Sequence, residues 1–559
     1  MAVLKNVFLV GLFIFIALGI LYPNPFGNNP DIILDESYFL TSALSAIEHR
    51  TLPGWDFPAS GTFYGGPQTY IDTLVLVPVI GTVLAASDFS VMAAKLWVAQ
   101  NTGELTHILR IVNGLLALLA IVYCFVLLRK KKAPLPLALM LTLFLFLLLG
   151  NAVAIGLLHT AKMWALYTVF VAVMSAIFIA QEYYLAHLGK PFMEKDRYVA
   201  LFVWAGVLTF FQSYFGVFSV ALLLLYALLL GHMSIRDVWR YALRRWYLIV
   251  LFALTQISFL YQAYRISEYF TDSSTKTAAG GIDWLTRLSQ PVIYTTLSQP
   301  LSLLYVAGIV VVVFLAFRSR ASFIHTRGRM WVAIAVLHPL LTYLFFHVGI
   351  GFDIGPRYAI ILGIACAFSA AILLAEIGRY ALRVSLLLSG ILFVVVNVHA
   401  IQLYWQASSE TVLVRTIFTQ LNSPDNVFLT DHSARRMTLP VNAASLSFLN
   451  ERRADMGRFR FLLDNREQIP ESPFKPIAIT AYSAEEEAEY FAEFATSTRS
   501  IWMIRRLCTE RCTATETEAG TCFEINMNAC DREAQEPNTL PDFLSTTQLG
   551  YSYVVRKVR

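Results

Sequence analysis

The sequence predicts a mainly α-helical, polytopic membrane protein with a small soluble domain at its C-terminal end. The chain has 559 residues, of which 57% are hydrophobic, and its mean hydropathy is +0.58. A soluble protein of this length does not need so much apolar surface. The apolar residues also gather in stretches long enough to cross a bilayer, and these stretches stop near residue 403. We therefore expect a membrane domain over 1–403 and a soluble domain over 404–559.

The apolar stretches predict about 11 transmembrane helices. The first stretch ends where Pro23 and Pro25 stop a helix. It lacks a small-residue cleavage site before Tyr22, which indicates a retained anchor rather than a cleaved signal peptide. The expected spans lie near 5–22, 107–128, 134–157, 163–183, 198–213, 214–231, 246–264, 300–317, 330–348, 358–376 and 384–403.

The distribution of basic residues predicts how these helices are oriented. The segment 70–86 is also apolar, but counting it as a span would place the basic run 129–132 outside. If 70–86 instead lies along the outer surface as an interfacial helix, this run and the later basic loops all fall inside, as the positive-inside rule prefers. We therefore expect an integral protein of the plasma (inner) membrane with a cytoplasmic N-terminus. The first outer loop and the domain 404–559 are then extracytoplasmic.

The domain 404–559 is expected to have an α/β or α+β fold. Short strands are predicted at 426–430, 476–480 and 500–505, and an acidic helix at 484–494. Four cysteines follow within a short stretch, at positions 508, 512, 522 and 530. In an exported domain they indicate two disulfides, with three possible connectivities. A zinc site is the alternative, although the spacing fits the common zinc patterns poorly.

The most unusual residues of the chain fall on the predicted outer side. Asp35 and Glu36 stand side by side shortly after the first span, in a long loop that also carries Asp56 and Tyr64. Adjacent carboxylates at a membrane surface favour each other's protonation, which suits acid–base chemistry. The plainer interpretation is that the pair caps and charges a helix over 37–49.

Cationic side chains are predicted at the same side. Arg110 opens the second span, His159 and Lys162 lie in the next outer turn, and Arg357 followed by Tyr358 opens a late span. A lipid phosphate ester is a suitable ligand for such a set. Structural roles are the alternatives: Lys162 could extend toward lipid headgroups, and Arg357 could pair with Asp353.

The order of these motifs resembles the C-type integral-membrane glycosyltransferases, in particular the protein O-mannosyltransferase and aminoarabinose-transferase branch. The resemblance covers 1–403 and rests on the acidic pair after the first helix, the long outer loop, the Arg that opens the second helix and Pro356-Arg357-Tyr358. The sequence departs from the family where Lys-Pro-Pro is common in the first loop, because Gly65-Gly66-Pro67-Gln68 stands there instead.

The resemblance implies an inverting transfer of a sugar from a polyprenyl-phosphate donor to a hydroxyl of a protein, lipid or glycan acceptor. Asp35 is then the expected general base, with Glu36 orienting it or binding an acceptor. The expected contacts to the donor phosphate come from Lys162, Arg357 and Arg110. The expected substrate-binding residues are His159, Tyr358, Tyr64 and Asp56. No cofactor, metal or nucleic acid is expected, and membrane lipids are the remaining partners.

Three alternatives stay open from the sequence. One is an assembly protein whose working part is the domain 404–559, which would leave the acids of the first outer loop without a role. An oligosaccharyltransferase-like or ligase enzyme would use a diphosphate-linked donor and a divalent cation, for which Asp31, Asp35 and Asp56 could supply oxygen ligands. A lipid or solute transporter would need charged residues near the middle of its helices, and the sequence has few of them.

Overall fold

The structure is a computed structural model of the whole chain. The residues described below are 2–21, 34–53, 66–212, 216–261, 303–311, 326–345, 359–406, 409–430, 442–446, 461–462, 464–469, 471–481, 483–506, 511–525, 540–548 and 552–559.

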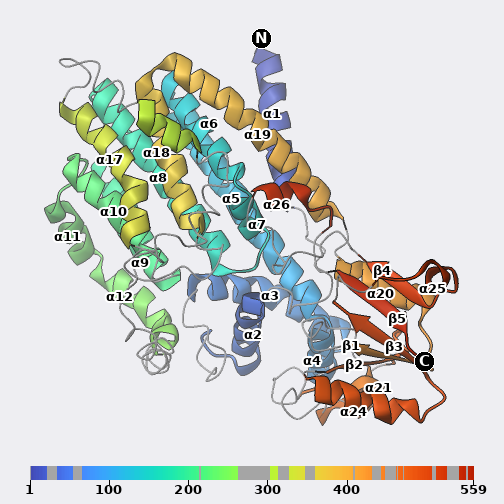
Figure 1. Cartoon of the computed structure of the whole chain (residues 1–559). Coiled ribbons are helices and arrows are strands. Elements are labelled where there is room, and N and C mark those ends of the chain that lie inside the picture. Colours follow the sequence, from blue (N-terminus) through green and yellow to red (C-terminus); the bar gives the residue numbers. More distant parts are fainter. Residues whose placement is uncertain are drawn as a thin grey trace, which may run out of the picture.

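Helices dominate the first 405 residues and form a bundle (Figure 1). Their bounds are α1 Ala2–Leu21, α2 Leu34–His49, α3 Gly66–Ala86, α4 Val91–Gln100, α5 Thr102–Lys130, α6 Leu135–Leu149, α7 Ala152–Leu158, α8 Met163–Leu188, α9 Lys195–Gln212, α10 Val217–Leu229, α11 Ile235–Arg244, α12 Trp246–Thr255, α17 Thr326–Thr342, α18 Ala359–Ile377 and α19 Arg379–Trp405.

The membrane character of the chain is confirmed, but the prediction of about 11 spans is not. In the part of the chain that the structure describes, five helices are long and apolar enough to cross a bilayer: α3, α5, α8, α18 and most of α19. The count rises to six if α6 and α7, which meet at a bend of 76°, form one broken span. Several expected spans correspond to apolar helices of only 10–17 residues, such as α10 and α12, and the expected span 300–317 is described only over 303–311.

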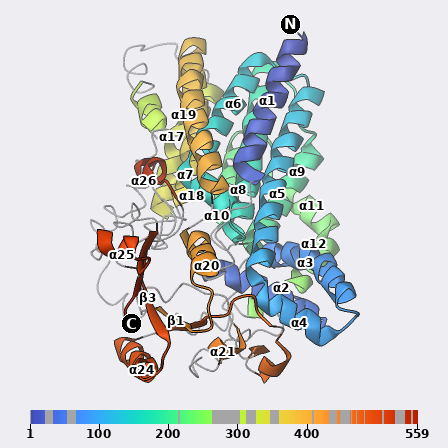
Figure 2. The same ribbon diagram turned by 90° about the vertical axis from the view of Figure 1, so that its right-hand side faces the viewer.

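Helix α3 has the composition of a span but a different placement. In both views α2, α3 and α4 lie across the end of the bundle, at the same end as the C-terminal sheet (Figures 1 and 2). The first turns of α3 bury Gln68, Thr69 and Asp72, whereas Leu74 and Val77 are 72% and 51% exposed. A helix that buries polar groups and exposes apolar ones fits a membrane surface, as expected for an interfacial helix.

The break between α6 and α7 is stabilised by two asparagines. Asn151 caps α7, because its side-chain oxygen accepts a hydrogen bond from Val153 N at 2.9 Å. Asn397 of α19 donates to the Leu149 carbonyl at the end of α6, at 3.0 Å. The backbone groups freed by the bend are therefore paired. The bend directs α7 and the turn that follows it toward α2.

The C-terminal region holds a five-stranded sheet in the order β2-β1-β3-β5-β4. Strands β1, β2 and β3 are parallel, while β5 is antiparallel to both β3 and β4. Helix α20 packs on one face and α24 on the other, each against its own apolar cluster. The bounds are α20 Ser409–Gln420, β1 Asn426–Thr430, α21 Ala443–Leu446, η4 Arg466–Gln468, β2 Ile477–Thr480, α24 Ala484–Ala495, β3 Ser500–Arg505, α25 Ala514–Glu518, β4 Cys522–Ile525, α26 Leu540–Ser545 and β5 Tyr553–Lys557.

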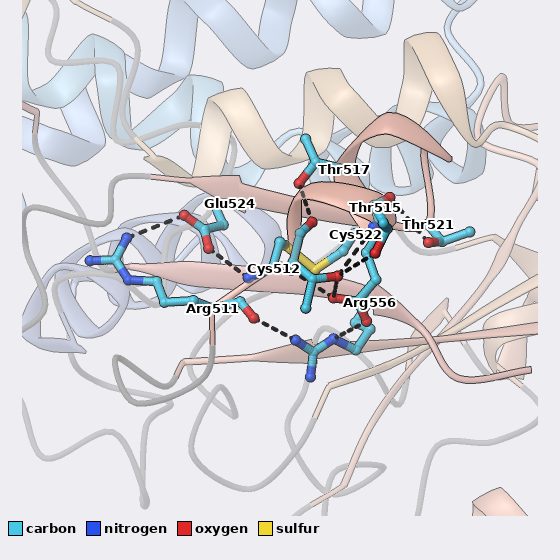
Figure 3. Close-up of a disulfide and its surroundings, with 10 residues drawn as sticks. Arg511, Cys512, Thr515, Thr517, Thr521, Cys522, Glu524 and Arg556 are labelled. Carbon is cyan, nitrogen blue, oxygen red and sulfur yellow. Dashed lines mark hydrogen bonds and ion pairs between the residues drawn. A yellow bond between two sulfur atoms is a disulfide. The ribbon is translucent and has the colours of Figure 1, made fainter.

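One predicted disulfide is present, and it encloses α25. Cys512 and Cys522 are bonded, with their Cα atoms 5.7 Å apart (Figure 3). Glu524 stabilises this loop, because its side chain accepts hydrogen bonds from Cys512 N at 2.7 Å and from Arg511 Nη1 at 3.2 Å. Cys508 and Cys530 lie outside the described residues.

The soluble region also contacts the membrane bundle. Leu540 and Phe543 of α26 are buried in an apolar cluster with residues of α1, α5, α7 and α19. Leu96 and Ala99 of α4 pack against Leu446 and Leu462. The acidic pair and the C-terminal sheet therefore share one end of the molecule, in agreement with a topology that places both on one side of the membrane.

Candidate functional site

A buried ion pair fixes the acidic pair to the second predicted span. Arg110 of α5 donates from Nε to Glu36 Oε1 at 3.0 Å and from Nη2 to Oε2 at 2.5 Å. Their side chains are 4% and 0% exposed. Glu36 Oε1 also accepts from the backbone N–H of Ala161 at 2.6 Å. A bidentate, charge-assisted contact of this kind holds the first turn of α2 rigidly against α5 and the α7–α8 turn.

The α7–α8 turn, residues 159–162, connects several elements at this site. Ala161 binds Glu36, and the Thr160 carbonyl accepts from Asn113 Nδ2 of α5 at 2.8 Å. His159 Nε2 lies 2.7 Å from the Gly19 carbonyl of α1, so this nitrogen is the donor, and the His159 ring stacks on Tyr404 of α19. These contacts give His159 a positioning role and leave its predicted substrate contact without support. Lys162, the last residue of the turn, is only 7% exposed.

A second carboxylate, Asp72, extends the site along α3. Gln68 Nε2 donates to Asp72 Oδ1 at 2.8 Å and to Asn113 Oδ1 at 3.1 Å. Gln68 N also donates to Gln212 Oε1 at the end of α9, at 3.0 Å. The side chain of Gln212 in turn donates to the Met163 carbonyl at 3.0 Å. Helices α3, α5, α8 and α9 therefore meet at one polar network.

The network contains buried acceptor oxygens that the described part of the chain does not satisfy. Asp72 Oδ2, Gln68 Oε1 and Gln256 Oε1 accept no hydrogen bond from the described residues, although all three side chains are buried. Gly66 lies against the same Gln256 oxygen, and a Cβ on Gly66 would come within 2.0 Å of it. Buried acceptors without donors are costly, and hydroxyl groups or a cation would satisfy them.

The remaining predicted site residues are Asp35, of which the structure describes only the backbone, and five residues that lie outside the described ranges. The backbone of Asp35 lies in the first turn of α2, which starts at Leu34 rather than at Ser37, so the acidic pair belongs to the helix instead of capping it. The side chain of Asp35 is not among those that the structure describes. Asp31, Asp56, Tyr64, Arg357 and Tyr358 lie outside the described residues, and their roles remain predictions.

The roles of Asp72, Gln68, Asn113 and Gln212 are not predicted from the sequence. Gln68 and Asp72 stand four residues apart at the start of an otherwise apolar helix, which places them on one helix face. This four-residue spacing of two polar side chains in an apolar helix is a sequence pattern from which a polar site on α3 could have been predicted. Asn113, inside α5, and Gln212, at the end of α9, are single polar residues of apolar helices, and only the fold brings them together.

Another buried acid–base pair lies far from this site. Glu182 Oε2 and His232 Nε2 are 2.5 Å apart, and Tyr198 Oη is 3.2 Å from His232 Nδ1. Glu182 is 19 residues beyond Met163 in α8, about 28 Å along the helix. These groups satisfy one another at the far end of α8 and do not contribute to the site around Glu36.

The described residues contain no group of three or more His, Cys, Asp or Glu side chains placed to hold a metal ion. Comparison with known protein families, with characterised proteins and with solved structures gives no significant match. The function is therefore inferred from the geometry of the site.

Proposed function

We propose that this protein is a membrane glycosyltransferase that moves a sugar from a polyprenyl-phosphate donor to an acceptor hydroxyl. The observation that carries the proposal is the buried Glu36–Arg110 pair with its third contact to Ala161 N–H. This arrangement fixes the Asp35 backbone at the end of the bundle, beside the turn that carries the buried Lys162. A carboxylate and a cation at headgroup depth are the two groups that the transfer requires.

The proposed reaction is a direct displacement. The acceptor oxygen attacks the anomeric carbon while the bond from that carbon to the phosphate oxygen breaks, and the configuration inverts. Asp35 accepts the proton of the acceptor hydroxyl. Lys162 and Arg357 balance the charge that gathers on the departing phosphate. Glu36 has both oxygens engaged and therefore serves as a positioning residue for Asp35.

The buried acceptors on α3 support a sugar as the transferred group. Sugar hydroxyls are hydrogen-bond donors, and Asp72 Oδ2 and Gln68 Oε1 are oxygens without donors among the described residues. The same oxygens are also ligands that a hard divalent cation prefers. This feature favours one alternative, a ligase-like enzyme that takes a diphosphate-linked donor with a metal ion.

The test is a transfer assay with the purified full-length protein. A panel of synthetic polyprenyl-phosphate sugars is supplied, and release of polyprenyl phosphate is measured with and without EDTA. We expect EDTA-resistant release from at least one donor. We also expect an Asp35→Asn variant to lose about 100- to 10,000-fold in rate. Glu48→Gln is the matched control, because Glu48 is on the same helix but pairs with Lys95 at the exposed surface.

The outcomes separate the candidate functions. Normal turnover by Asp35→Asn would mean that the base is another residue. Consumption of a diphosphate-linked glycan only in the presence of a divalent cation would establish the ligase alternative instead. If neither donor class is consumed while a labelled lipid crosses the bilayer of proteoliposomes, the protein is a transporter.

A further inference from the structure

A long cleft opens between α1, α5, α6 and α8. Its volume is about 770 Å³, and its walls are mainly apolar side chains, many of them small. Two cations, Arg129 and Lys132, line one end of it, and both are exposed. Arg129 lies in the last turn of α5 and Lys132 in the turn that joins α5 to α6, so the charged end of the cleft is the end of the bundle opposite α2 and α3.

The depth of the cleft matches the length of a lipid acyl chain and exceeds what a small polar ligand needs. Its lining on α5 runs from Ala117 to Arg129, 12 positions apart and therefore about 18 Å along the helix. Half of a hydrocarbon core is about 15 Å. A single extended chain that enters beside Arg129 would therefore reach just past the middle of the bilayer. The cations would then lie at the depth of its headgroup.

The conformation of Lys132 is a second, independent observation. Helix α5 ends in a Schellman motif, in which Ala133 N donates to the Leu128 carbonyl at 3.0 Å and Lys132 N donates to the Arg129 carbonyl at 3.1 Å. Lys132 occupies the left-handed position of this motif with a φ of 50°. Glycine is preferred there, and a lysine is strained. The chain nevertheless places a cation at the mouth of the cleft.

We propose that this cleft binds an anionic phospholipid, with one acyl chain between α5, α6 and α8 and its phosphate at Arg129 and Lys132. By the positive-inside rule, this lipid belongs to the cytoplasmic leaflet. The site is separate from the one around Glu36, because Arg110 and Arg129 are 19 residues apart on α5, about 28 Å. The proposal therefore does not depend on the proposed transfer reaction.

Lipid binding is measured by native mass spectrometry of the full-length protein in a neutral detergent. The two probes are dioleoyl phosphatidylglycerol and dioleoyl phosphatidylcholine, which share acyl chains and differ in net charge. We expect the anionic lipid to bind more tightly, and the difference to shrink as salt increases. Each cation near a lipid headgroup should contribute about fivefold, so Arg129→Gln with Lys132→Gly should lose about 30-fold.

Three variants make the test specific. Lys132→Gly removes the charge at a position where glycine is preferred, so the protein should stay as stable as the wild type or become more stable while it loses anionic lipid. Lys130→Gln removes a charge from the same basic run, but Lys130 does not line the cleft, and lipid binding should not change. Ala138→Phe fills the cleft without changing its charge and should weaken both lipids.

Equal affinity for the two lipids would overturn the proposal, as would equal losses in Lys130→Gln and Lys132→Gly. Unchanged binding in Ala138→Phe would show that the lipid is held at the surface and not in the cleft. Tighter binding of a polyprenyl phosphate than of phosphatidylglycerol, lost in the same variants, would assign the cleft to a donor lipid instead.

Discussion

Glu36 and Arg110 form a buried bidentate ion pair across 74 residues of sequence, with contacts of 3.0 and 2.5 Å. Two of the three guanidinium nitrogens are engaged by one carboxylate. From the sequence, Arg110 is expected to contact the donor phosphate. The pair instead gives Arg110 a structural partner, and any contact to phosphate must come in addition to it.

Replacing either Glu36 or Arg110 alone should destabilise the folded protein. We expect Glu36→Gln or Arg110→Gln each to lower the free energy of unfolding by about 3–5 kcal/mol, because each leaves a buried charge alone. The double variant Glu36→Met with Arg110→Met should recover most of this loss. The free energy of unfolding of each variant is measured by reversible denaturation in mixed micelles. Equal losses in the single and double variants would show that the two residues stabilise the fold independently.

The disulfide should stabilise the soluble domain of the full-length protein. Cys512 and Cys522 close a short loop, and replacing both with Ala should lower the free energy of unfolding by about 2–3 kcal/mol.

Because Cys512 pairs with Cys522, the remaining two of the four clustered cysteines are expected to pair as Cys508–Cys530. Non-reducing peptide mapping checks this expectation. Free thiols at 508 and 530 in the protein as isolated would contradict it.

The stability of the loop around α25 should depend on acid pH through Glu516. Hydrogen bonds from the backbone and side chain of Thr513 lower the pKa of Glu516 below its ordinary 4.5, with Arg556 adding to the shift. A lowered pKa means that the contribution to stability is complete above pH 4.5 and is lost as the pH falls through the folded-state value. The protection factors of the amides in 513–521, which are corrected for the intrinsic change of the exchange rate with pH, should therefore decrease in acid. Glu516→Gln should abolish this dependence, whereas Glu518→Gln on the same helix should keep it.

The local features of the fold were predictable because local patterns determine them. Strands β1, β2 and β3 and helix α24 begin and end within about one residue of the expected ranges, since each is a short apolar run or an acidic segment between turn residues. Helix α3 is itself long and apolar enough to cross a bilayer, so its interfacial position remains a prediction from the charge distribution. The expected count of about 11 spans is not confirmed, since five or six spans of sufficient length are found among the described residues and apolar length does not distinguish a full span from a shorter helix.

The polar network was only partly predictable, and the reason is sequence distance. Glu36 and Lys162 were selected for their residue types at the predicted outer surface. Gln68 contacts Gln212 across 144 residues, and no local pattern records such a pairing. Asp72 was overlooked because a single acid in an apolar helix resembles an ordinary surface residue until the packing shows it to be fully buried.

Asp72 should matter more for function than for stability. It is buried, and its Oδ2 has no donor among the described residues, so burial of this carboxyl group destabilises the fold. Asp72→Asn should keep or raise the thermal midpoint. It should lower kcat/KM about 10- to 100-fold if Asp72 binds a substrate hydroxyl. Asp88→Asn is the control, since Asp88 lies exposed just beyond the same helix. A variant with normal kcat/KM and lower stability would make Asp72 a packing residue.

Lys162 should act on the leaving group rather than on the fold. It is buried at the N-terminal end of α8 and is adjacent to Ala161, whose N–H binds Glu36. Removing one charged contact to a phosphate costs about 2 kcal/mol, so Lys162→Gln should lower kcat/KM about 30-fold and weaken product inhibition by polyprenyl phosphate. Lys162→Arg should retain much of the wild-type kcat/KM and of the product inhibition, because arginine keeps the positive charge. Lys190→Gln, at an exposed position beyond the far end of α8, should change neither. If Lys162→Gln loses thermal stability but binds polyprenyl phosphate as the wild type does, the phosphate site must be formed by other cations, with Arg357 the first to test.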